Sequence, residues 1–226
     1  MNSREDCTHC GLCKKNCSFL EKYGLDIGQI EDREDLIYHC FLCGKCTEVC
    51  PQNIDGREII LRMRQKQVEE NRGKVKEKGY TMLLKEKQDY LFRNYQNVTT
   101  KSVLFTGCNF PSFYPETTKY LITKLQKEKG IGVIFDCCGK PIAELGLKEQ
   151  EKRIIDEMEE RLQQEEIEEV IMLCPNCYSF LKDRLRIKIV SIYEKLQEFG
   201  WGEEIKGKVN IFPPCPDREK QTLLKE

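Results

Sequence analysis

The 226-residue sequence predicts an α+β multidomain protein, in which an α-helical domain is followed by an α/β domain with a parallel sheet. Three observations lead to this prediction. The fourteen cysteines fall into two blocks, residues 7–50 and 108–215, and none lies between them. In the first block, the segment between two cysteine runs is helical in character. From residue 101, short runs of β-branched and aromatic residues alternate with helical segments.

The first block contains two copies of one cysteine spacing, C-x2-C-x2-C-x3-C. Four thiolates at this spacing can hold a cubic iron–sulfur cluster, and the fourth cysteine of each run normally serves the other cluster. We therefore predict two 4Fe-4S cubane clusters with crossed ligands. One is held by Cys7, Cys10, Cys13 and Cys50, and the other by Cys40, Cys43, Cys46 and Cys17. Structural zinc sites are the alternative, but zinc ribbons use paired C-x2-C units.

Helices are expected around these cysteine runs. The stretch SFLEKYGLDIGQIEDREDLIYH joins the two runs, with Gly24 and Gly28 as breaks. After Cys50, an amphipathic helix is indicated by Ile59, Ile60 and Met63, which share one helix face. We place the helical domain at residues 1–70 and a charged helical connector at residues 71–100.

Strands and helices alternate in the rest of the chain, which indicates a parallel α/β sheet over residues 101–226. The predicted strands are Val103–Phe105, Val133–Phe135, Val170–Leu173, Ile187–Val190 and Val209–Phe212. Pro115 suits the first turn of one intervening helix. In another helix, Ile154, Met158 and Leu162 recur at every fourth position.

The cysteines of the second block follow these strands. Cys108 follows the first strand, Cys137 and Cys138 follow the second, Cys174 follows the third, and Cys215 follows the last. The carboxyl ends of parallel strands meet at one edge of the sheet, where open α/β folds bind their ligands. We therefore expect the cysteines to gather at that edge.

Adjacent cysteines form a disulfide only with strain, so Cys137 and Cys138 are predicted to face one metal centre. Cys174 and Cys177, in MLCPNCYSF, add a C-x2-C pair at the neighbouring strand end. This pair is also similar to a thioredoxin-type C-P-x-C site. A thioredoxin site, however, has no need of Cys108 or of the adjacent pair.

Composition narrows the class of protein further. The 37 basic and 38 acidic side chains give a formal charge of −1, so no nucleic-acid partner is expected. The N-terminal MNSREDCTHC has no apolar stretch of signal-peptide length, and no later run approaches a membrane span. We expect a cytoplasmic protein without a membrane span. Disulfides are rare in that compartment, so clustered cysteines indicate metal ligands or redox sites.

The spacing from Cys108 to Cys177, C-x28-CCG-x34-C-x2-C, resembles the CCG domain of the catalytic B subunit of heterodisulfide reductases. In that family, five cysteines hold a noncubane 4Fe-4S cluster made of two fused halves. The resemblance implies such a cluster here, held by Cys108, Cys137, Cys138, Cys174 and Cys177. The first block is similar to the C subunit, an α-helical ferredoxin with two cubanes. The chain thus resembles a heterodisulfide reductase C/B-type fusion, like the D-type subunit.

The sequence departs from this family in one respect. The catalytic subunits usually carry two CCG motifs, whereas this sequence has one, and VNIFPPCPDRE around Cys215 looks like the start of a second. Disulfide cleavage between two noncubane clusters is therefore not a firm expectation here, and whether the chain is an enzyme stays open.

The leading functional prediction is an electron-transfer subunit that passes electrons between the cubanes and the CCG-domain cluster. No Gly-rich nucleotide loop occurs, so a flavoprotein or other redox subunit of a larger complex is the implied partner. A disulfide or thiol reductase acting on a small disulfide at the CCG cluster is one alternative. A zinc-bearing or docking CCG domain without chemistry is the other.

Overall fold

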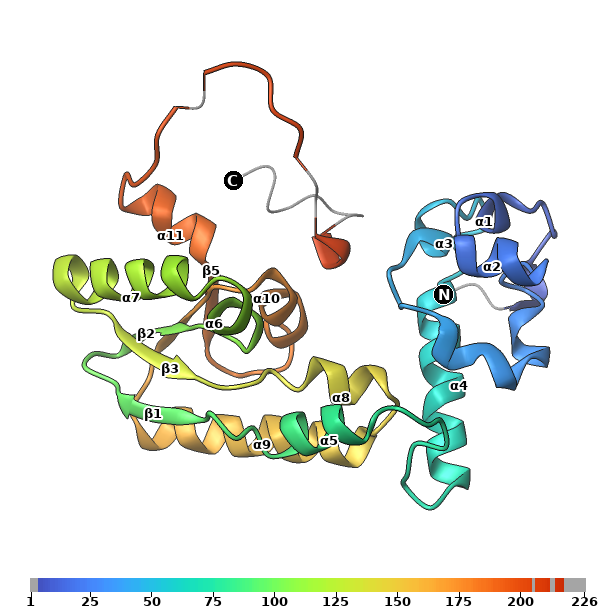
Figure 1. The fold of residues 1–226 in the computed structure, drawn as a ribbon, viewed down its shortest axis with the longest axis horizontal. Coiled ribbons are helices and arrows are strands. Elements are labelled where there is room, and N and C mark those ends of the chain that lie inside the picture. The colour runs from blue at the N-terminus through green and yellow to red at the C-terminus, as the bar shows by residue number, and fades with distance from the viewer. Residues whose placement is uncertain (1–3, 205, 212–213, 218–226) are drawn as a thin grey trace. The chain divides into compact units, whose positions relative to one another are not determined.

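Figure 1 shows the computed structural model, which describes residues 4–204, 206–211 and 214–217. The chain divides into two compact units. One comprises Met1–Leu84 with Pro141–Glu149, and the other comprises Lys85–Lys140 with Gln150–Glu226. A short segment that follows the CCG motif in sequence therefore packs with the cysteine-rich N-terminal part. The sequence-based limits at residues 70 and 100 stay a prediction.

The first unit is built from short helices around a small apolar core. Its α-helices are α1 (Leu12–Lys15), α2 (Ser18–Tyr23), α3 (Lys45–Glu48) and α4 (Gly56–Glu70). Three 3-10 helices complete it: η1 (Arg4–Asp6), η2 (Ile30–Asp32) and η3 (Glu34–His39). The core consists of apolar residues that separate the cysteine loops, among them Leu20, Ile30, Ile37, Ile54 and Ile60.

Helix α4 forms where the sequence predicted it. The Asp55 carboxylate caps its N-terminus by accepting the N–H groups of Arg57 and Glu58. Ile59 and Ile60 are buried on the face toward the core. The predicted amphipathic helix is therefore confirmed.

The second unit contains a five-stranded sheet in the order β1-β3-β2-β4-β5. The strands are β1 (Asn94–Asn97), β2 (Ser102–Phe105), β3 (Gly132–Phe135), β4 (Glu169–Met172) and β5 (Lys188–Ser191). Strands β2 to β5 are parallel, as predicted. Strand β1 pairs antiparallel with β3, so the sheet is mixed. The sequence NYQN of β1 is polar and has no alternating apolar pattern, which is why sequence analysis placed it in the connector.

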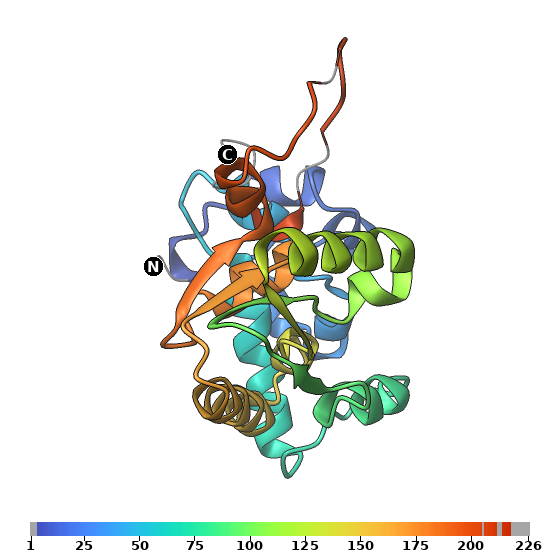
Figure 2. The ribbon, with the colours of Figure 1, turned by 90° about the vertical axis from the view of Figure 1, so that its left-hand side faces the viewer.

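Helices cover both faces of this sheet (Figures 1 and 2). The helices from residue 81 onward are α5 (Thr81–Gln88), α6 (Asn109–Phe113), α7 (Pro115–Lys129), α8 (Lys140–Glu144), α9 (Lys148–Gln164), α10 (Pro175–Leu181) and α11 (Ile192–Glu198). Helix α7 packs through Leu125 onto the sheet residues Leu104 and Ile171. Helix α9 lies on the opposite face and buries Ile154, Met158 and Leu162, as its sequence spacing predicted.

The predicted strand Val209–Phe212 is not formed by residues 209–211, and Phe212 lies outside the described residues. Val209 and Ile211 are 56% and 65% exposed, so their apolar side chains are not held against a sheet. An alternating pattern alone does not make a strand where no neighbouring strand buries it. As for membrane spans, each helix in the described part of the chain is too short or too polar to cross a bilayer.

Candidate metal centres

The first group of cysteines lines one cavity in the first unit. The walls of this cavity include Cys7, Cys10, Cys13 and Cys50. Three of these cysteines come from the first run and the fourth comes from the second run. The structure therefore brings together the crossed set that the spacing predicted.

A buried carboxylate lies beside this group. Asp26 is 7% exposed, and its Oδ1 lies 3.9 Å from the Sγ of Cys7. The same oxygen accepts the N–H of Gly28 at 2.9 Å. The other oxygen lies 2.9 Å from Nδ1 of His9, whose side chain is mostly exposed. The first group thus has a negatively charged neighbour that is shielded from water.

The second group is formed by Cys17, Cys40, Cys43 and Cys46. Burial raises the pKa of the Cys46 thiol to about 12, and the charges of the other three sulfurs add to this rise. Burial likewise raises the pKa of Cys40, with Cys17 and Cys43 among its neighbours. The fourth cysteine of the first run therefore lies with the first three of the second run.

Five cysteines of the second unit meet at the carboxyl ends of three neighbouring strands. Cys108 follows β2, Cys137 and Cys138 follow β3, and Cys174 follows β4. Cys177 lies in the first turn of α10, which begins directly after Cys174. All five side chains are buried. The predicted gathering of these cysteines at one sheet edge is confirmed.

Interactions between neighbouring thiols join the five cysteines into one group. They link Cys108 to Cys137, Cys137 to Cys138, Cys138 to Cys177, and Cys177 to Cys174. The hydrogen bonds from Cys137 and Cys177 lower the pKa of Cys138. The hydrogen bond with Cys177 lowers the pKa of Cys174 to about 7.

Gly107 allows this close packing of thiols. Its φ of +68° is in the left-handed region. A Cβ atom at this position would lie 3.0 Å from the Sγ of Cys177 and 3.4 Å from the Cβ of Cys174. Any side chain at residue 107 would therefore displace the Cys177 thiol or strain the backbone.

Two residues outside the cysteine motifs also reach the five-cysteine group. Lys87 lies near Cys108 and Cys137 and interacts electrostatically with both. Tyr90 is buried against the same two cysteines. Sequence analysis missed both, because they lie in the stretch interpreted as a charged connector and belong to no motif. A lysine and a tyrosine three residues apart carry no signal of a metal site.

Cys215 is placed differently from the prediction. It is exposed and lies in the 3-10 helix η4 (Cys215–Asp217), which packs against α10. The predicted position directly after a sheet strand is wrong, since residues 209–211 form no strand. Any role of this thiol stays a prediction.

The cysteine groups fit iron–sulfur clusters by their chemistry. Within the described residues, the cysteines form no disulfide. Sets of four thiols suit cubane clusters, which take four thiolate ligands. A structural zinc ion also takes four ligands, so the five-cysteine group has one thiol more than a zinc site uses.

Comparison with known protein families agrees with this chemistry. Residues 3–54 match the family of 4Fe-4S dicluster domains, and residues 102–182 match the family of cysteine-rich CCG domains. The chain is therefore an iron–sulfur protein that joins a 4Fe-4S dicluster domain to a CCG domain. The domain order expected from the heterodisulfide reductase C/B-type fusion is confirmed.

Curated relatives come from methanogenic archaea. An uncharacterized iron–sulfur protein of Methanococcus maripaludis is 28% identical over 239 residues, covering 92% of this chain and 47% of that protein. Another, from Methanocaldococcus jannaschii, is 26% identical over 217 residues, 84% of this chain and 43% of its own length. The B subunit of fumarate reductase (CoM/CoB) from Methanothermobacter marburgensis is 26% identical over 186 residues, 73% of this chain and 37% of that protein. The chain spans less than half the length of these relatives. No solved structure is a significant match.

Proposed function

We propose that this chain is the electron-transfer subunit of a heterodisulfide-reductase-like oxidoreductase complex. Two 4Fe-4S cubanes would be held by the two crossed groups of four cysteines described above. A noncubane 4Fe-4S cluster would be held by the five-cysteine group. Such clusters supply one-electron carriers, and electrons would pass between the cubanes and the CCG-domain centre.

The observation that carries this proposal is the five-cysteine group. Its members come from three strand ends, are all buried, and are close enough for neighbouring thiols to shift one another's pKa. A structural staple would pair cysteines, and a thioredoxin-type site would need only Cys174 and Cys177. Five converging thiols are instead the number that the CCG family uses for its noncubane cluster.

The partners are proposed on two grounds. One relative is named as a component of fumarate reductase (CoM/CoB), which indicates assembly with other redox subunits. The two matched domains bring cysteine sites but no nucleotide-binding motif, so a flavoprotein is the proposed two-electron donor or acceptor. We place the complex in the cytoplasm of an anaerobic cell.

The proposal is tested by metal analysis after anaerobic purification with any co-purifying subunits. About twelve irons and a matching amount of sulfide per chain are expected, eight in the cubanes and four in the third centre. About eight irons with zinc would instead support a zinc-bearing CCG domain. About eight irons without zinc would contradict the noncubane cluster.

A disulfide reductase acting at the CCG site is the second candidate. The observation that favours it is Lys87, whose ammonium beside Cys108 would stabilise a thiolate released from a small disulfide. The test is reoxidation of the reduced protein by a small disulfide such as cystine. A reductase would be reoxidised with release of two thiols per two electrons, and Lys87→Met would slow the reaction. A pure electron carrier would not respond to the disulfide.

A further inference from the structure

A buried arginine lies beside the second cysteine group. Arg64 of α4 is 4% exposed, although most arginines in proteins lie at the surface. Its Nη2 donates to the carbonyl of Cys40 at 2.6 Å and to that of Ile37 at 2.8 Å. Its Nε donates to the Ile37 carbonyl at 3.2 Å. The guanidinium thus holds the backbone that leads into the second cysteine run.

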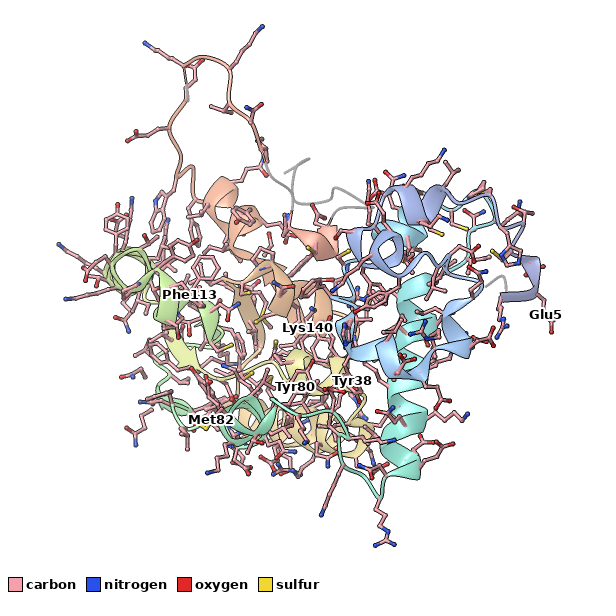
Figure 3. All side chains as sticks on the ribbon, turned by 45° about the vertical axis from the view of Figure 1, so that its right-hand side comes forward. Glu5, Tyr38, Tyr80, Met82, Phe113 and Lys140 are labelled. Carbon is pink, nitrogen blue, oxygen red and sulfur yellow. The ribbon has the colours of Figure 1, made fainter. Side chains whose placement is uncertain are left out.

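The same side chain holds a second segment. Its Nη1 donates to the carbonyl of Glu144 in α8 at 2.6 Å. The centre of the Tyr38 ring lies 4.9 Å from the guanidinium carbon, and the Tyr38 hydroxyl donates to the Leu145 carbonyl. The same ring packs beside Tyr80 (Figure 3). Glu144 belongs to Pro141–Glu149, the segment that follows the Cys137–Cys138–Gly139 motif in sequence and packs in the first unit.

The hydrogen-bond acceptors of Arg64 are neutral carbonyls, so these bonds leave its positive charge in place. That charge lies beside the second cysteine group, since Nη2 is 2.6 Å from the carbonyl oxygen of Cys40. Reduction adds a negative charge to an iron–sulfur cluster, so a nearby buried cation stabilises the reduced state. The first cysteine group has the opposite neighbour, the buried Asp26 carboxylate at 3.9 Å from Cys7.

We propose that Arg64 raises the reduction potential of the second cubane above that of the first, so that electrons entering this unit collect at the second cubane. This inference rests on the proposed function, since it requires both cubanes. One electron leaves the first cubane for each one that the second takes up, and no bond forms or breaks. Arg64 is a positioning and electrostatic residue here, and not a ligand.

The test is a redox titration of the full chain, followed by electron paramagnetic resonance under anaerobic conditions. The two cubane signals are assigned with Cys10→Ser and Cys43→Ser, which alter the first and second cubane respectively. In the unmodified protein we expect the second cubane to be reduced first. Arg64→Gln should shift the second cubane to more negative potential and leave the first unchanged. Arg64→Lys keeps the positive charge, so the reduction potential of its second cubane should stay close to that of the unmodified protein.

Arg57 provides the matched control. It lies in the same helix, but its guanidinium is partly exposed and its charge is offset by the Glu144 carboxylate at 3.2 Å. Arg57→Gln removes the same charge and should move neither potential. Reduction of the first cubane before the second in the unmodified protein would overturn the inference. An unshifted potential in Arg64→Gln would overturn it equally.

If Arg64→Gln loses iron, the order of reduction in the unmodified protein and in Arg64→Lys decides the question. If the second cubane is reduced first in the unmodified protein and in Arg64→Lys, the inference is supported. If the first cubane is reduced first in either protein, the inference is contradicted. Failure of the proposed function would give a different spectroscopic result. An unmodified protein without two cubane signals would contradict the proposed function itself, whatever the effect of Arg64.

Discussion

Most cysteines of the first unit are partly exposed, whereas those of the five-cysteine group are all buried. Cys10 is exposed and six other cysteines of the first block are half-buried. Cys108, Cys137, Cys138, Cys174 and Cys177 are all buried. The first eight sit on two short runs of chain, each of which bends around its own site. The other five sit on strand ends that are far apart in sequence.

This difference indicates how each site depends on the rest of the fold. A short cysteine run brings three ligands together by local geometry, and only the fourth must come from elsewhere. The five-cysteine group exists only when β2, β3 and β4 are paired side by side. A disturbance of packing should therefore affect the CCG site more than the first two groups.

Loss of a thiol from the five-cysteine group should have the largest effect. Cys138 has both Cys137 and Cys177 as neighbours that shift its pKa, so it lies at the centre of the group. Cys138→Ser should reduce the iron content from about twelve to about eight per chain and leave the cubane spectra unchanged. Iron analysis and electron paramagnetic resonance measure both. Unfolding of the whole protein, with no selective loss of iron, would indicate a structural role for this thiol instead.

Removal of Cys17 tests the crossed grouping in the first unit. Cys17 lies with Cys40, Cys43 and Cys46, which are distant from it in sequence. Cys17→Ala should damage the second cubane, a loss of up to about four irons, and leave the first intact. Cys50→Ala is the matched control and should damage the first cubane. The opposite pattern in the spectra of the two variants would show that each run serves its own cluster.

A packing change at Gly107 should have an intermediate effect. In Gly107→Ala, the left-handed backbone costs about 1–2 kcal/mol. The new Cβ, 3.0 Å from the Cys177 sulfur, adds about 1–3 kcal/mol of overpacking. We expect a lower melting temperature and loss of iron from the third centre first. Gly202→Ala is the control, since a Cβ there meets no atom within 4 Å. Equal iron contents in both variants would contradict the predicted sensitivity of this site.

Substitution of Cys215 should have the smallest effect. The residue is exposed, and five thiols are present without it. Cys215→Ser should keep the iron content and the spectra of all three centres, as measured by metal analysis and electron paramagnetic resonance. Loss of about four irons would make Cys215 a ligand of the third centre. Loss of disulfide reduction with full iron content would make it a catalytic thiol.

Sequence alone determined the features that depend on neighbouring residues. The cysteine spacing predicted a dicluster domain followed by a CCG domain, because cluster-binding loops are encoded in short runs. Apolar spacing predicted α4 and α9, because an amphipathic helix repeats every three to four residues. Four of the five predicted strands formed for a similar reason, since buried parallel strands are short apolar runs.

Tertiary structure decided what no local pattern records. Strand β1 is polar, and only its pairing with β3 makes it a strand. Val209 and Ile211 have a strand-like pattern, yet they remain exposed and unpaired in the described structure. Lys87 and Arg64 look like ordinary residues of charged helices in the sequence. Folding places one against Cys108 and the other against the Cys40 carbonyl. The physical reason is that burial and contact depend on which distant segments pack together, and a side chain's own sequence neighbours do not specify them.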